Sequence, residues 1–233
     1  MSVDLTLSVS RDIRRSPRHG HTRAGESDSM DALRGSVLGQ GRHGRRCASC
    51  SVHFGAWDGF ELTHLDGDHS NDRLENLAPI CRLCHWSLHL DLIVRKNSSE
   101  PGVLIYLPEL EQFELNQLLY AIGAYECEAS EPGGPQERIG WKLYGKLEGR
   151  SAVLEGDSAT GERAGLSKIH SVVRLLQDVK DERYATRSEW LRGCRYLPAL
   201  SEVLKESAEL RKHGAAFAAI PFASWSVIKE RRS

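Results

Sequence analysis

The sequence predicts an α+β protein in which a small cysteine-bearing core precedes a mostly α-helical C-terminal region. Two observations carry this prediction. First, two Cys-x-x-Cys pairs, Cys47/Cys50 and Cys81/Cys84, enclose a stretch with the residue patterns of strand, loop and helix. Second, apolar residues recur at helical spacing over most of the chain beyond residue 140. The 233 residues are enough for one domain of fair size or two small ones.

The composition is that of an ordinary globular protein, with 40% hydrophobic and 27% charged residues. The formal net charge of −1 gives no overall electrostatic reason to expect nucleic acid as a partner. No run of 18 apolar residues is present, so we expect no transmembrane segment. The N-terminus has no secretory signal pattern, and the six cysteines are therefore expected to be reduced.

Four regions are predicted along the chain. Composition separates them, because a stretch rich in Gly, Pro and Glu follows the cysteine-bearing part and an apolar tail, interrupted by Pro221, ends the sequence. The regions are residues 1–28 (short strand and flexible basic loop), 29–127 (zinc-binding domain with a following strand and helix), 128–140 (linker) and 141–233 (helical region with an apolar tail over 214–233).

The first elements follow from alternation and from capping residues. Apolar residues alternate with polar ones over Leu5–Val9, which predicts a short strand, and five arginines mark the loop after it. Ser29 can cap a helix that ends at the glycines before Cys47. Residues 54–64 are expected to form a hairpin around Asp58-Gly59.

The later elements follow from apolar spacing. A turn-rich loop leads to a short apolar segment, and helices and strands then alternate up to the linker. Beyond the linker the patterns are helical throughout. Before the linker, the predicted elements are a loop over 65–76, a short apolar segment over 77–80, a helix over 82–96, a strand over 102–108 and a helix over 109–126. After the linker, helices are predicted over 141–154 and 166–181, a short helix begins at Ser188, and a last helix runs from Pro198 to about His213.

The four paired cysteines predict one metal site. Two Cys-x-x-Cys pairs can place four thiolates around a zinc ion at about 2.3 Å each. Such a site leaves no open coordination position, so the zinc is expected to be structural and to supply folding free energy on the order of 10 kcal/mol. The predicted ligands are Cys47, Cys50, Cys81 and Cys84.

Histidines and asparagines around these cysteines resemble the His-Asn-His (HNH) nuclease motif. His64 precedes the turn-rich loop, Asn76 ends it, and His85 and His89 follow the last cysteine. The resemblance implies an HNH-like ββα core in which His64 is the general base and Asn76 orients the loop. It also implies that His85 or His89 binds a second divalent ion at the scissile phosphate.

One position departs from that motif. Thr63 stands where HNH nucleases usually carry an Asp or His that binds the catalytic ion. Asp66 and Asp68 are the nearby carboxylates that could replace it. Without an anionic ligand, Mg²⁺ binding would be weakened, so an HNH-shaped fold without catalysis is the alternative to a working nuclease.

A second resemblance reaches beyond the motif. The block Leu65–Leu77, the second cysteine pair and the block Gly102–Asn116 are similar to the IcmJ/DotN family of type IVB secretion systems. This implies a non-catalytic subunit of the coupling complex with zinc on the same four cysteines. The implied partners are the C-terminal extension of a DotL-like coupling ATPase, with IcmS–IcmW-type adaptors nearby, at the cytoplasmic face of the inner membrane.

These observations leave three hypotheses. The first is an interaction subunit of a type IVB coupling complex, located in the cytoplasm and peripheral to the inner membrane. The second is a metal-dependent HNH endonuclease, because the chain keeps His64, His85 and His89, whereas the family's members lack the catalytic His and the His after the last Cys. The third is a DNA-binding module without catalysis, which the near-neutral charge favours least. We favour the first.

Overall fold

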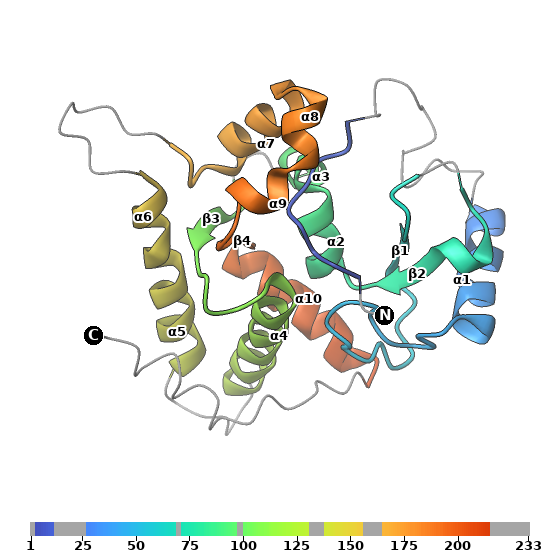
Figure 1. The fold of residues 1–233 in the computed structure, drawn as a ribbon. Coiled ribbons are helices and arrows are strands. Elements are labelled where there is room, and N and C mark those ends of the chain that lie inside the picture. The colour runs from blue at the N-terminus through green and yellow to red at the C-terminus, as the bar shows by residue number, and fades with distance from the viewer. Residues whose placement is uncertain are drawn as a thin grey trace.

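The computed structural model describes residues 3–11, 27–68, 71–96, 100–130, 138–155 and 165–214. In this part of the chain, helices surround two small antiparallel sheets of two strands each (Figure 1). This confirms the predicted α+β class. The predictions made for the basic loop over residues 12–26 and for the tail after residue 214 lie outside the described residues.

The first sheet joins the two halves of the cysteine-bearing core. Strand β1 (Glu61–His64) pairs with β2 (Leu77–Ile80), so that His64 lies opposite Leu77. A short 3-10 helix, η3 (Leu74–Asn76), leads into β2, and helix α1 (Ser27–Gln40) contacts β2. The predicted hairpin around Asp58-Gly59 is therefore wrong.

Aromatic packing explains why the segment before β1 does not form a hairpin. The rings of Phe54 and Phe60 stack with their centroids 5.1 Å apart, and both side chains are fully buried. This contact folds residues 54–60 back on themselves as part of the core. The partner strand for β1 then comes from beyond the turn-rich loop.

The predicted helix over residues 82–96 is two helices, α2 (Arg82–Leu88) and α3 (Leu90–Lys96). The N-terminal segment explains the break. Ser8 donates its N–H to the carbonyl of Ser87 (3.2 Å) and accepts from the N–H of Leu90 (3.0 Å). Residues 3–10 thus have the predicted alternation of burial, but their backbone pairs with the ends of two helices instead of with another strand.

The second sheet joins distant parts of the sequence. Strand β3 (Val103–Tyr106), which was predicted, pairs with β4 (Cys194–Leu197), which was not. The sequence analysis gave residues around Cys194 to a helix. Gly193, at φ +79°, ends the helical run because that backbone conformation favours glycine. Before β4 come α7 (Ile169–Asp178), α8 (Asp181–Ala185) and α9 (Arg187–Trp190).

Two helices that are far apart in the sequence pack against each other. Helix α4 (Gln112–Ala129) lies against α10 (Leu200–Lys212), as Figure 1 shows. Gly123 allows this approach, because a Cβ atom there would lie 2.0 Å from the Ser207 hydroxyl oxygen. Helix α10 also reaches the cysteine core, since Arg82 of α2 bonds the fully buried Glu206 near the middle of α10 at 2.9 Å.

The predicted linker lies between elements that contact each other. After α4 the chain returns as α5 (Ile139–Glu148), η4 (Gly149–Ser151) and α6 (Ala152–Glu155). The buried Glu126 of α4 accepts hydrogen bonds from Arg138 and from the Trp141 N–H (3.1 Å) at the start of α5. The boundaries of domains remain a prediction, but the residues on the two sides of 128–140 share a sheet and a helix pair.

Candidate metal centre

The four predicted cysteines converge in the core. Their sulfur atoms all lie within 4.8 Å of one another, and the Cys50 and Cys81 sulfurs are 3.6 Å apart. All four side chains are at most 1% exposed. Among the described residues, this is the group of three or more His, Cys, Asp or Glu side chains with the spacing of metal ligands.

Local backbone geometry brings each pair to the site. The first pair lies in a tight knuckle, where the Ser51 N–H bonds the Cys47 carbonyl (3.0 Å) and Ser51 takes the left-handed conformation at φ +61°. The Ala48 N–H then bonds the Pro79 carbonyl (2.8 Å), which docks the knuckle on β2. The second pair begins at Cys81, the residue that precedes α2, so both its sulfurs face the knuckle from the first helical turn.

Two N–H groups point at sulfur atoms. The Cys81 backbone N–H lies 3.4 Å from the Cys47 sulfur, and the Asn116 side-chain amide lies 3.2 Å from the Cys84 sulfur. Asn116 is fully buried on α4. Hydrogen bonds of this kind stabilise the thiolate form and fix the orientation of a metal ligand.

Burial shapes the protonation of the cluster. Burial raises the pKa of the Cys50 and Cys84 thiols well above the usual value, because a thiolate loses its hydration there. Burial also acts on Cys47, but hydrogen bonds from the other three thiols and the Cys81 N–H outweigh it and bring the pKa of Cys47 well below the usual value. Four thiolates in so dry a site would repel one another strongly unless a cation balanced them.

The arrangement fits a metal ion such as zinc. Sulfur ligands at about 2.3 Å in a tetrahedron lie about 3.8 Å from one another, close to the 3.6 Å between Cys50 and Cys81. Four sulfurs would fill the coordination shell and leave no position for a substrate. The chemistry that this cluster supports is therefore structural.

At the end of β2 that is remote from Cys81, Asn76 closes the turn-rich loop. Its side-chain oxygen accepts the Asp66 N–H (3.0 Å), and its amide donates to the Asp66 carboxylate (2.9 Å) and the Asn71 carbonyl (2.8 Å). A hydrogen bond from Asn71 and others lower the pKa of Asp66. His64, at the end of β1, places Nε2 2.9 Å from the Asp72 carboxylate. Asn76 thus holds the loop together through hydrogen bonds to Asp66 and Asn71, and the catalytic roles that the motif implies for Asn76 and His64 stay predictions.

The two later histidines lie at the end of α2. His85 and His89 are 3% and 8% exposed, and their ring centroids are 4.7 Å apart. The Ser10 hydroxyl lies 2.9 Å from His89 Nδ1, while the Ser10 N–H bonds the buried Asp91 carboxylate at 2.9 Å. Burial raises the pKa of Asp91. Within the described part of the chain, the predicted histidines do not join a set of three ligand atoms within 4.8 Å.

A cleft of about 1050 Å³ lies beside β1. Its walls come from the N-terminal segment, the β1–β2 loop and helices α8 and α9. Thr63, His64 and His89 line it together, whereas His85 is not among its lining residues. Basic and acidic side chains both reach the cleft, including Arg42, His43, Asp66 and Glu75. The structure thus brings two of the three predicted histidines to one surface.

Two polar residues of α4 were missed as parts of the site. Gln112 exchanges hydrogen bonds with the backbone of Tyr196 in β4 (2.8 and 3.0 Å) and donates to the Asn116 side chain (3.0 Å). Asn116 in turn bonds Cys84. A sequence signal was present, since an i, i+4 pair of amides on the apolar face of an amphipathic helix indicates buried polar contacts.

Among the described residues, no helix combines the length and the hydropathy that a membrane span requires.

Comparison with known proteins gives a curated relative that covers part of the chain. No protein-family model matches the chain. The type 4 apparatus protein DotN of Legionella pneumophila subsp. pneumophila is 28% identical over 146 residues, which are 63% of this chain. The match spans 64% of the length of that relative, less than two thirds. It confirms the resemblance that the motif blocks predicted. Over this stretch the chain is similar to DotN, which supports the family resemblance seen in the sequence.

Proposed function

We propose that this chain is a zinc-containing, non-catalytic subunit of a type IV secretion apparatus. The observation that carries the proposal is the identity of 28% over 146 residues with a protein named for that apparatus. Relatives that share a fold and a buried cysteine set also tend to share the assembly in which the fold is used. The function therefore lies in protein contacts, and the metal stabilises the part of the chain that makes them.

Zinc is the metal that the donor set favours. Soft thiolate ligands select zinc over magnesium, calcium or manganese, which prefer oxygen. The sulfurs belong to Cys47, Cys50, Cys81 and Cys84, and Asn116 holds one of them from α4. Zinc would then connect β2, α2 and the first knuckle, while Asn116 and Gln112 extend the same contact to β4.

An HNH-like ββα core accounts for the order of elements around the zinc. Strand β1, the loop closed by Asn76, strand β2 and helix α2 follow one another as hairpin and helix. Thr63 lies inside this hairpin, opposite Ala78 and 4% exposed. A buried threonine brings no negative charge to an ion, which favours use of the fold for assembly over use for phosphodiester cleavage.

The partner that fits this role is the C-terminal extension of a DotL-like coupling ATPase, with IcmS–IcmW-type adaptors nearby. Such a subunit would work in the cytoplasm, at the inner membrane, through its partners. The test is co-elution of the full chain with the tagged extension from the same organism in size-exclusion chromatography. We expect one joint peak. Separate peaks, with correctly folded and zinc-loaded protein, would contradict the proposal.

The second candidate function is an HNH endonuclease, and the cleft is the observation that favours it. The cleft holds His64, the expected base, and His89, an expected ligand of a second ion. The discriminating assay is plasmid nicking in Mg²⁺, Mn²⁺ or Ni²⁺ by the wild type and by His64→Ala. We expect no nicking. Metal-dependent nicking that disappears in a folded, zinc-loaded His64→Ala protein would establish the nuclease instead.

A further inference from the structure

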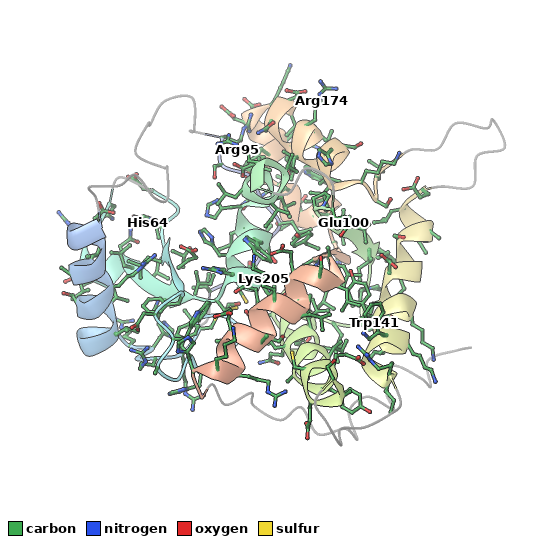
Figure 2. All side chains as sticks on the ribbon, turned by 180° about the vertical axis from the view of Figure 1, so that it is seen from behind. His64, Arg95, Glu100, Trp141, Arg174 and Lys205 are labelled. Atoms are coloured by element: carbon green, nitrogen blue, oxygen red, sulfur yellow. The ribbon has the colours of Figure 1, made fainter. Side chains whose placement is uncertain are left out.

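Helix α4 links the cysteine core to the second sheet through two buried amide side chains. The helix lies between the side of the molecule that carries His64 and the side that carries Trp141 (Figure 2). Gln112 and Asn116 stand about one helical turn apart on it and are 3% and 0% exposed. Buried amides cost free energy unless their hydrogen bonds are made, so the partners of these two side chains define what the pair can do.

The backbone of β4 fixes the orientation of the Gln112 amide. The Tyr196 N–H donates to Gln112 Oε1 at 2.8 Å, and Gln112 Nε2 donates to the Tyr196 carbonyl at 3.0 Å. A backbone N–H can only donate and a carbonyl can only accept, so the two ends of the Gln112 amide cannot exchange places without loss of both bonds. The second N–H of Nε2 is thereby left for the Asn116 side chain.

Gln112 in turn fixes the orientation of the Asn116 amide. Gln112 Nε2 donates to Asn116 Oδ1 at 3.0 Å, which turns the Asn116 NH₂ group to the Cys84 sulfur at 3.2 Å. A thiolate has no proton to donate and can only accept, so an N–H group stabilises it, whereas an amide oxygen in the same place would repel it. The backbone of Tyr196 thus determines, through two side chains, that Cys84 receives a donor.

We infer that Gln112 is a positioning residue of the metal centre and acts on Cys84 through Asn116. Four thiolates around a zinc ion leave an excess of negative charge in a buried site, and an N–H group at a sulfur offsets part of it. Gln112 contributes by holding Asn116 in the donating orientation. Retention of zinc therefore depends on a residue that is not one of the four cysteines and, through it, on the docking of β4. The inference rests on the zinc of the proposed function and is independent of the partner protein.

The test measures the zinc affinity of the full-length chain by competition with a chelator, and the thiolate-to-metal absorption band of the Co²⁺-loaded protein. Asn116→Asp keeps the size of the side chain and an oxygen for Gln112, but it places a carboxylate oxygen at Cys84. Gln112→Met keeps the volume of the side chain and releases Asn116. We expect each variant to bind zinc at least about tenfold more weakly than the wild type, the scale found for outer partners of metal ligands, and to shift the Co²⁺ band.

The double variant decides whether Gln112 acts through Asn116. If it does, Gln112→Met should lower the zinc affinity no further in a chain that already carries Asn116→Asp, whereas independent effects would multiply. Gln112→Ala, which leaves room for water at the Tyr196 backbone, takes the place of Gln112→Met if that variant does not fold. Tyr196→Phe is the matched control, because it removes a buried hydrogen bond to the Pro101 carbonyl (2.7 Å) and leaves the backbone of residue 196 in place. It should lower the melting temperature without a change in zinc affinity or in the Co²⁺ band.

Each outcome decides for or against the role of Gln112. Weaker zinc binding by both single variants, with no further loss in the double variant, supports it. Wild-type affinity in either single variant, multiplied losses in the double variant, or an equal loss in Tyr196→Phe overturns it and leaves the proposed function standing. A wild-type chain that binds no zinc overturns both this role and the zinc of the proposed function.

Discussion

Replacement of Cys84 by serine should release the metal and lower the stability of the whole chain. Cys84 supplies one of four buried sulfurs, and its loss also removes the partner of the buried Asn116 amide. Structural zinc sites contribute about 10–16 kcal/mol, which is comparable to or larger than the roughly 5–15 kcal/mol that keeps a domain folded. If only about 5 kcal/mol of this is lost, the melting temperature of a chain of this size falls by roughly 10–20 °C.

The assay measures zinc per chain by elemental analysis and melting by calorimetry, after dialysis against a chelator. Wild-type protein should keep about one zinc per chain, as one four-sulfur site requires, and Cys84→Ser should lose it together with its cooperative transition. Cys127→Ser is the matched control, because Cys127 is partly exposed and lies outside the cluster. A Cys84→Ser protein that keeps its zinc and its melting temperature would refute the reasoning.

Three further predictions concern packing and charge. Gly123→Ala should destabilise the fold by about 1–3 kcal/mol in urea denaturation, because the new Cβ would overlap the Ser207 side chain and force α4 from α10. Glu126→Gln should cost about 1–2 kcal/mol in the same assay, since it weakens the cap of α5 and the contact with the half-exposed Arg138. Asp91→Asn should change the dependence of melting temperature on pH. Burial raises the folded pKa of Asp91 above its unfolded value, so the stability that this group contributes is fully present below about pH 4 and is lost as pH rises through the folded pKa.

Each of these changes has a matched control. Gly145→Ala, at a helical glycine in open space, should stabilise the protein by up to about 1 kcal/mol. Glu209→Gln breaks a surface pair with Lys212, whose two side chains are 37% and 66% exposed, and should leave the denaturation midpoint almost unchanged. Asp178→Asn, at an exposed carboxylate of α7, should keep the pH dependence of the wild type. A variant that behaves like its control would show that the contact proposed for it contributes nothing.

Local patterns explain what could be predicted from the sequence. The convergence of Cys47, Cys50, Cys81 and Cys84 follows from two short spacings, because each pair is built by a single turn of backbone. The strand at 103–106 and the helix after it also follow from apolar periodicity over a few residues. The identity of the metal and the roles of the histidines remain predictions.

Contacts between distant residues explain what could not be predicted. Strand β4 exists because Tyr196 and Leu197 lie beside β3, more than 90 residues earlier in the chain. The break between α2 and α3 depends on Ser8, whose carbonyl binds Leu90 across about eighty positions. Asn116 reaches Cys84 only once α4 has packed on the core. None of these pairings has a signature at short range.

The central proposal is a subunit that assembles a secretion apparatus and does not cleave nucleic acid. Complementation tests it most directly: a strain that lacks this gene receives the wild type, His64→Ala or Cys84→Ser, and translocation of a secreted substrate is measured. We predict that the wild type and His64→Ala restore translocation equally and that Cys84→Ser does not. Translocation that the gene does not affect, or that folded His64→Ala protein fails to restore, would contradict the proposal.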